Sequence, residues 1–301
     1  MPAITKIKIL IFVMYMIILR NEICDKLENI VKNLKFVRHC IGCEGINLDI
    51  ENPHHHPSIE LTQKCNLNCI YCYSRLKTVE RGIYGNLEEA EAVTISQYGE
   101  PLLDLEGVKK AIEFCKDLGL RVDLQTNGTL LNEEIIKELK DLGLDLIMIS
   151  LSAFSSERYK LLTGKDYFDI VLNNIKTASK YLHTIVRAIY IPGFNDNELL
   201  NLAKELNGYA DEIMVHQLIS YKENEDLLKN AGIDLSNLGR VRDLLLIVNE
   251  MQKNAPKINV TIKGCLLVQL KEMDGFILNN ITYDVFSEVP DIKRDYKPIP
   301  W

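Results

Sequence analysis

Hydrophobic and polar residues alternate along the middle of the chain in two recurring patterns. Short runs in which apolar residues are consecutive or occupy every second position predict β-strands. Longer runs with apolar residues at positions i, i+3, i+4 and i+7 predict amphipathic helices. The predicted strands are Ser58–Gln63, Ala92–Gln97, Leu120–Gln125, Leu144–Leu151, Thr184–Ile191 and Glu212–Ile219. The predicted helices are Leu105–Leu118, Glu133–Leu142, Ser156–Tyr181 with a break at glycine, Asn197–Asn207 and Ser236–Asn254.

Strands that alternate with helices predict an α/β fold made of parallel βαβ units with right-handed crossovers. The pattern supplies six such units, fewer than the eight of a closed TIM barrel. It divides the chain into an N-terminal extension (1–56), a central α/β domain (57–255) and a C-terminal extension (256–301). Within the last part, Lys257–Lys263 is a candidate further strand, and the tail from Leu278 to Trp301 is expected to be irregular.

The N-terminal extension contains an apolar run, Ile9–Leu19, followed by an amphipathic helix predicted over Asn21–Lys35. The run has eleven residues, whereas a helix needs about 20 apolar residues to span a bilayer. No small-residue cleavage site follows the run, which argues against a signal peptide. It is interpreted as a buried strand or helical turn, or as an upstream extension with the functional start at Met14 or Met16. A membrane-surface anchor is the alternative.

Overall composition fits a globular protein and narrows the classes of partner. Of the 301 residues, 47% are hydrophobic and 26% are charged, and the formal net charge is −7. The isoelectric point near 5.5 argues against nucleic acid as the main partner. Eight cysteines, three of them clustered, indicate a reduced, cytoplasmic protein rather than a disulfide framework.

The clustered cysteines are Cys65, Cys69 and Cys72, spaced C-x3-C-x2-C on a loop that leaves the first predicted strand. Thiolates grouped on one loop are typical metal ligands, and three soft ligands suit an iron–sulfur cluster. A [4Fe–4S] cube has four irons, so three protein ligands leave one iron open to another ligand. A zinc knuckle is the alternative, although zinc sites usually have a fourth protein ligand.

This spacing, with Tyr71 before the last cysteine and the sequence ELTQKCNLNC in front, resembles the radical SAM superfamily. The resemblance is closest to the branch that includes the MoaA-type molybdenum-cofactor enzymes and the SPASM peptide-modifying proteins. It implies a partial (β/α)6 TIM-type barrel with N- and C-terminal extensions. It also implies that the open iron binds S-adenosylmethionine (SAM) and that the reduced cluster cleaves SAM to a 5′-deoxyadenosyl radical. An electron donor such as a ferredoxin or flavodoxin would then be a partner.

The resemblance also implies a set of cofactor-binding residues at the carboxyl ends of the strands, where parallel sheets bind ligands. Gly99-Glu100-Pro101 resembles the family's Gly-Gly-Glu-Pro motif, with Tyr98 in place of the first glycine. Ser150 matches the serine that follows the fourth strand in relatives, and Arg187 matches a basic residue on the fifth. The residues implied to bind the cofactor are Tyr71, Gly99, Glu100, Thr126, Asn127, Ser150, Arg187, Ile191 and Gly193.

A second set of cysteines lies in the two extensions. Cys40 and Cys43 form a C-x2-C pair, and Cys24 and Cys265 are the candidates to complete a site for a second iron–sulfur cluster or zinc. The alternatives are a partly buried thiol pair or a redox dithiol. Cys115 lies on an amphipathic helix and is expected to be a core residue.

Histidines supply weaker signals. His54, His55 and His56 are adjacent in the sequence. Adjacent histidines rarely bind the same metal ion, so they are interpreted as part of a polar loop near the expected barrel mouth. On the sixth strand His216 and Gln217 are candidates to reach a substrate, although a lone histidine there is more often structural. The sequence identifies no catalytic side chain.

The sequence therefore predicts a radical SAM enzyme that abstracts hydrogen from a small metabolite, a cofactor precursor or a peptide. The acidic charge disfavours RNA as the substrate. Two alternatives stay open: a radical SAM methyltransferase, and a non-catalytic iron–sulfur or zinc subunit of a larger assembly.

Overall fold

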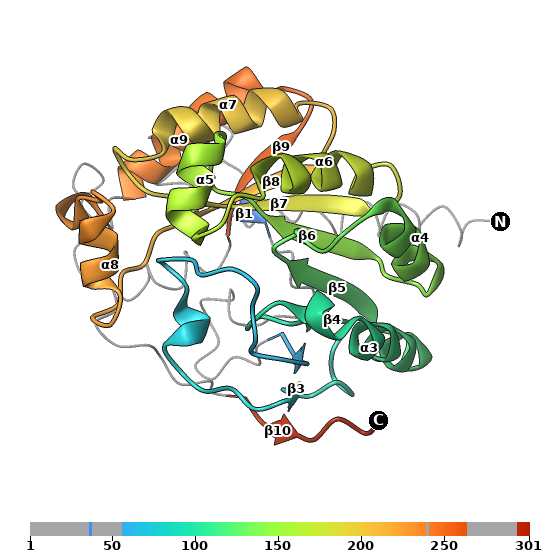
Figure 1. Cartoon of the computed structure of the whole chain (residues 1–301). Helices are drawn as coiled ribbons and strands as arrows, with labels where there is room; N and C mark the ends of the chain where they lie inside the picture. Colours follow the sequence, from blue (N-terminus) through green and yellow to red (C-terminus); the bar gives the residue numbers. More distant parts are fainter. Residues whose placement is uncertain (1–35, 38–55, 239–240, 264–293) are drawn as a thin grey trace.

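The computed structural model describes residues 36–37, 56–238, 241–263 and 294–301 of the chain (Figure 1). Within these residues one sheet runs in the order β1-β9-β8-β7-β6-β5-β4-β2-β3-β10. The strands from β1 to β2 in this order are all parallel, whereas β3 and β10 pair antiparallel. The parallel strands are β1 (Phe36–Val37), β2 (Ser58–Glu60), β4 (Ala92–Ile95), β5 (Arg121–Thr126), β6 (Leu146–Ser150), β7 (His183–Tyr190), β8 (Glu212–Gln217) and β9 (Asn259–Lys263).

Helices cover the outer face of this sheet (Figure 1). They begin at polar caps that the sequence supplies: the Asn132 side chain accepts a hydrogen bond from Ile135 N, and Ser155 accepts one from Arg158 N. Gly164, with φ 78°, ends one helix and separates it from the next, as expected from the glycine in this stretch. The helices are α3 (Leu105–Asp117), α4 (Glu133–Asp141), α5 (Ser156–Thr163), α6 (Phe168–Ala178), α7 (Asp196–Leu206), α8 (Glu225–Asn230) and α9 (Val241–Asn254).

The two faces of the sheet pack differently. The main core lies between the sheet and its helices and includes Val186, Ala188, Ile213 and Val215. Alternate positions on the inner face form a separate buried cluster of Leu146, Met148, Ile185 and Met214. Because side chains alternate along a strand, the next inward positions toward the carboxyl ends are Ser150, Arg187 and His216. Polar residues thus follow the apolar layer at the mouth of the barrel.

The predicted α/β fold is confirmed, and all six predicted strands are present as β2, β4, β5, β6, β7 and β8. The candidate strand at Lys257–Lys263 is β9, which lies beside β8 inside the parallel series. The expectation of an irregular tail is wrong in part, because Tyr296–Lys297 forms β10 and pairs with β3 (Gly82–Tyr84), a strand that the pattern did not predict. Such short strands carry too few residues to show a period.

Some predictions concern residues outside the described ones. They are the apolar run Ile9–Leu19, the helix Asn21–Lys35, and the second cysteine set of Cys24, Cys40, Cys43 and Cys265. Among the described residues, no helix combines the length and apolar character that crossing a membrane requires.

Candidate active site

The cysteine loop extends from β2 across the mouth of the barrel and is tied to α5 by its backbone. Asn68 N donates to Thr163 O at 2.8 Å, and Ile70 N donates to Leu162 O at 3.0 Å. The side chain of Gln63 joins the segments before and after the cysteines, because its Oε1 accepts a hydrogen bond from Val79 N at 3.1 Å. The cysteines therefore sit on a segment with a fixed path rather than on a free loop.

The sulfurs of Cys65 and Cys72 have hydrogen-bonding neighbours. Cys65 Sγ accepts from Leu67 N at 3.4 Å and lies 3.7 Å from Asn127 Nδ2. Cys72 Sγ lies 3.2 Å from Ser74 Oγ. Donors around ligand sulfurs are a common way for a protein to tune an iron–sulfur cluster.

Burial disfavours the thiolate form of two of these cysteines when no positive charge is close to them. Burial, with smaller contributions from Cys72 and Cys65, raises the pKa of the Cys69 thiol to about 12. Burial also raises the pKa of the Cys65 thiol. Metal ligation requires thiolates, so bound iron has to supply the positive charge that stabilises them.

Three cysteine thiolates are soft ligands of the kind that binds iron–sulfur clusters. Within the part of the chain that the structure describes, no three His, Cys, Asp or Glu side chains are arranged around one metal ion. In a [4Fe–4S] cube each thiolate binds a different iron, so the three sulfurs do not need to meet at one point.

Gly99 supports the start of the cysteine loop. Its φ is 76°, and a Cβ at this position would lie 2.3 Å from Thr62 O and 2.8 Å from Lys64 O. Glu100 N also donates to Lys64 O at 2.8 Å. Only glycine allows this approach of two backbones, which gives a physical reason for the glycine beside the cysteine loop.

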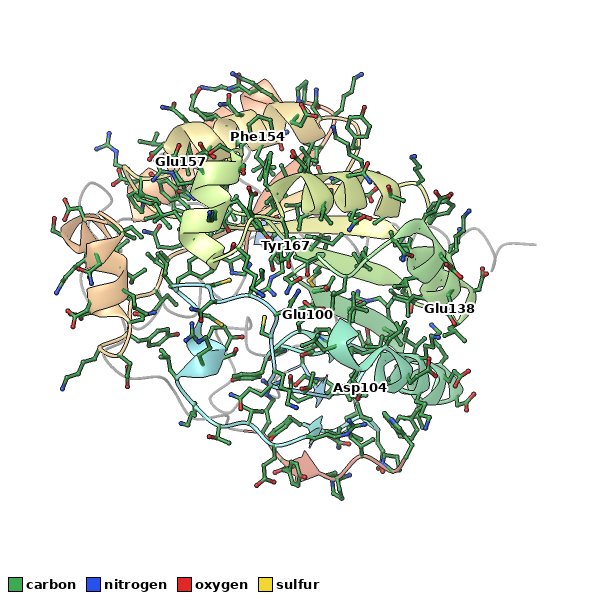
Figure 2. The ribbon with its side chains drawn as sticks, in the orientation of Figure 1. Glu100, Asp104, Glu138, Phe154, Glu157 and Tyr167 are labelled. Atoms are coloured by element: carbon green, nitrogen blue, oxygen red, sulfur yellow. The ribbon has the colours of Figure 1, made fainter. Side chains whose placement is uncertain are left out.

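The Glu100 carboxylate connects neighbouring loops inside the protein. It accepts hydrogen bonds from Leu102 N at 3.0 Å, Thr126 Oγ1 at 2.8 Å and Asn127 N at 2.7 Å. The residue is 0% exposed, and burial raises the pKa of its carboxyl to about 6. In Figure 2 it lies near the centre of the view, where the site loops meet. Its side chain therefore positions Thr126 and Asn127 and is not itself open to a ligand.

The other expected cofactor-binding residues differ in how accessible they are. Ile191 is 0% exposed and Thr126 is buried, so neither side chain is open to a ligand in this structure. Ser150 and Gly193 are exposed, whereas Tyr71, Asn127 and Arg187 are partly exposed. Arg187 donates to Gln125 Oε1 inside the barrel, and its charge acts on Tyr73 of the cysteine loop. The accessible residues of the expected set are Tyr71, Gly99, Asn127, Ser150, Arg187 and Gly193.

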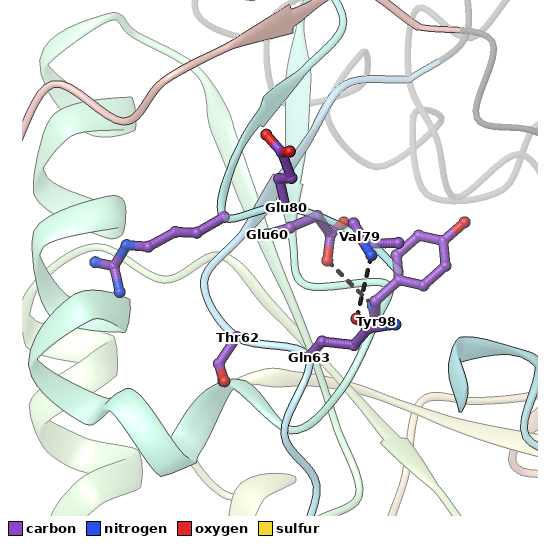
Figure 3. A pocket seen from close by; sticks show the side chains of 7 residues that line it. Glu60, Thr62, Gln63, Val79, Glu80 and Tyr98 are labelled. Atoms are coloured by element: carbon purple, nitrogen blue, oxygen red, sulfur yellow. Dashed lines mark hydrogen bonds between the residues drawn. The ribbon is translucent and has the colours of Figure 1, made fainter. Parts of the chain in front are cut away.

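Glu60 is a site residue that the sequence pattern did not reveal. Its buried carboxylate accepts from Gln97 N at 3.0 Å and Tyr98 N at 3.1 Å, and so holds the turn after β4. Figure 3 shows Glu60 and Tyr98 lining a small pocket beside Gln63 and Val79. In this turn Ser96 adopts φ 57°, which is uncommon for a residue other than glycine. In the sequence, the position of Glu60 at the end of the first predicted strand is the feature that could have indicated this role.

The histidine expectations have separate outcomes. His56 is buried, and its Nε2 lies 2.9 Å from Thr94 Oγ1, as expected of a structural histidine. His216 lies on the inner face of β8 and is partly exposed, so a role at the substrate stays a prediction. Gln217 is 8% exposed, and its amide has no hydrogen-bond partner among the described residues.

Comparison with known proteins agrees with this geometry. Residues 59–206 match the model of the Radical SAM superfamily. The chain is 92% identical to the Methanocaldococcus jannaschii protein MJ0804, over 95% of this chain and all of that protein. It is 31% identical to a probable GTP 3′,8-cyclase of Pyrococcus abyssi, over 48% of this chain and 51% of that one.

Among solved structures, the Streptococcus suis protein SuiB bound to its precursor peptide SuiA has a similar fold. The TM-score is 0.55 at 17% identity, over 70% of this chain and 49% of SuiB. The cyclase and SuiB are thus matched over about half of their own lengths. The residues that match the family model contain the cysteine loop, the Gly99–Glu100 support and the strand ends that surround them. Residues 59–206 of this chain belong to the radical SAM superfamily.

Proposed function

We propose that this protein holds a [4Fe–4S] cluster on Cys65, Cys69 and Cys72 and uses it to cleave SAM and abstract hydrogen from a substrate. The observation that supports this most directly is the cysteine loop, which is hydrogen-bonded to α5 and has hydrogen-bonding neighbours at the sulfurs of Cys65 and Cys72. When bound and reduced, the cluster supplies the electron that cleaves SAM to a 5′-deoxyadenosyl radical.

The chain's own residues would bind and orient the cofactor. Asn127 lies beside Cys65, and its backbone position is set by Glu100. Ser150 and Arg187 are paired across β6 and β7, so both are placed at the same mouth. A guanidinium there provides a counter-charge for the carboxylate of the methionine moiety. Exposed Gly193 leaves room for a ligand to approach the backbone after β7.

The substrate is proposed to be a small cofactor precursor or metabolite. The sequence similarity to a probable GTP 3′,8-cyclase, 31% identity over 48% of this chain, supports this proposal. A peptide substrate is the second candidate. The electron donor would be a ferredoxin or flavodoxin, and the reducing cytoplasm is the compartment that suits the cluster thiols.

The experiment is to purify the protein without oxygen, reconstitute iron and sulfide, reduce with dithionite and add SAM. We expect 5′-deoxyadenosine from the wild type and none from Cys69→Ser, because that variant loses a cluster ligand. Cys115→Ala is the matched control: Cys115 is buried in α3, away from the cysteine loop, so activity should persist.

Other outcomes separate the alternatives. A cluster that is reduced but neither binds nor cleaves SAM would contradict the proposal and favour a non-catalytic subunit. Formation of S-adenosylhomocysteine would instead indicate methyl transfer. Radical cleavage in the presence of candidate precursors, followed by mass spectrometry of the mixture, would then identify the substrate class.

A further inference from the structure

The last eight residues of the chain, 294–301, form a C-terminal segment that lies along the edge of the sheet. β10 pairs antiparallel with β3, and Gly85 N donates to Asp295 O at 2.7 Å. Figure 1 shows β10 beside β3, at the opposite end of the sheet from β1 and β9. β3 in turn pairs with β2, the strand from which the cysteine loop emerges. The segment is therefore separated from that strand by a single neighbour.

Side-chain packing fixes the segment at two further points. The Tyr296 ring lies over Gly82, where a Cβ would be 2.2 Å from the ring, and packs edge-on against Tyr84 with centroids 5.4 Å apart. At the end of the chain, Trp301 packs on Phe114 of α3 with ring centroids 5.1 Å apart. These contacts hold the segment against both the sheet edge and a helix.

Arg294, the first residue of the segment, reaches inward from this edge. Its Nη1 donates to His56 O at 3.0 Å and Ser58 Oγ at 3.2 Å. Its Nη2 donates to Gln97 Oε1 at 2.8 Å. One guanidinium therefore joins the start of β2 to the turn after β4, with a fixed geometry that a lysine could not reproduce.

The turn that Arg294 contacts is the one that leads into Gly99 and Glu100. Glu60 holds the backbone N–H groups of Gln97 and Tyr98, and Arg294 holds the Gln97 side chain. Burial raises the pKa of the Glu60 carboxyl, and the charge of Arg294 opposes part of this shift. Glu60 thus binds the backbone of this turn, and Arg294 binds one of its side chains.

We infer that Arg294 is a positioning residue for the SAM site: it holds the Gln97–Glu100 turn in place, so the C-terminal segment completes the site. This rests on the proposed function, in which the cofactor binds at the carboxyl ends of the strands; Gly99 of this turn is partly exposed there. The position of a supporting turn matters because a small displacement of a binding group costs a large factor in affinity or rate.

The test measures SAM affinity per reconstituted cluster, by anaerobic equilibrium dialysis, together with iron content and thermal midpoint. Arg294→Ala should weaken SAM binding by about 10- to 100-fold. Iron content should stay near that of the wild type, because the hydrogen bonds of Arg294 go to β2 and the turn rather than to the cysteines. Arg294→Lys should restore part of the affinity. Lys297→Ala, at an exposed position of β10, is the matched control and should leave the affinity unchanged.

Trp301→Ala provides a second, independent variant. It loosens the far end of the segment without touching the turn and should also weaken SAM binding, by a smaller factor. Wild-type affinity per cluster in both Arg294→Ala and Trp301→Ala would overturn the inference while leaving the proposed function intact. If the wild type itself binds no SAM, the proposed function fails, and this inference fails with it.

Discussion

Gly99 shows how one residue can govern the cluster site. Its φ is 76°, and a side-chain Cβ would come within 2.3 Å of Thr62 O, so there is no space for a methyl group. Backbone strain alone costs about 1–3 kcal/mol, and Gly99→Ala should destabilise the protein by more than that because it adds this clash. It should also lower reconstituted iron content, because the cysteine loop must move. Denaturant unfolding and iron analysis measure the two effects.

A matched glycine separates strain from steric displacement. Gly119 has φ 74°, close to that of Gly99, but has open space around a Cβ. Gly119→Ala should therefore show the backbone strain without the loss of iron. Equal iron content in the two variants would argue against a supporting role for the Gly99 contact.

At the scale of elements, Asn195 joins the loops that follow β6 and β7. Its buried side chain accepts from Ile191 N at 2.8 Å and donates to Ser152 O at 2.9 Å and Ile189 O at 2.8 Å. Asn195→Ala should cost about 2–3 kcal/mol of unfolding free energy, because buried backbone groups lose their partners. It should also weaken SAM binding if the 191–193 segment lines the pocket.

Urea unfolding of the reconstituted protein measures the stability change, and dialysis measures the affinity. Asn197→Ala, at an exposed position two residues later on α7, should alter neither quantity by a comparable amount. A stability loss for Asn195→Ala without a change in SAM affinity would place these loops outside the cofactor pocket.

Elements such as these differ in how far the sequence determines them. The six strands and the long helices were predictable because burial of one face imposes a period on a run of residues. A cluster-binding role could be predicted for the three cysteines because binding one cluster restricts the spacing of its ligands in the sequence. By contrast, β3 and β10 are too short to show a period, and the contact of Tyr296 with Arg81 joins residues 215 positions apart. The roles of Glu60 and Arg294 depend on such distant pairing.

At the scale of the whole molecule, cofactor binding should increase the free energy of unfolding. A ligand that binds only the folded state at 100 times its Kd stabilises by about 2.7 kcal/mol, which corresponds to roughly 4 °C in thermal midpoint for a chain of 301 residues. We expect SAM to raise the midpoint of the cluster-loaded protein. The cluster-free protein should respond less, since the open iron contributes to binding.

Anaerobic differential scanning calorimetry with and without SAM tests this expectation. Cys69→Ser, which removes one cluster ligand, is the control and should resemble the cluster-free wild type. An equal increase in all of these samples would show that SAM binds independently of the cluster and would contradict the proposed site.

The pairing of β10 with β3 also has a consequence for biosynthesis. β3 and the cysteine loop are made early, whereas β10 (Tyr296–Lys297) leaves the ribosome long after β3 (Gly82–Tyr84). At a synthesis rate of about 5–20 residues per second, the edge of the nascent sheet at β3 lacks its final partner for roughly ten seconds or more. During that interval Arg294 has not been synthesised, so its hydrogen bonds to β2 and to the turn after β4 form only after residue 294 has been added.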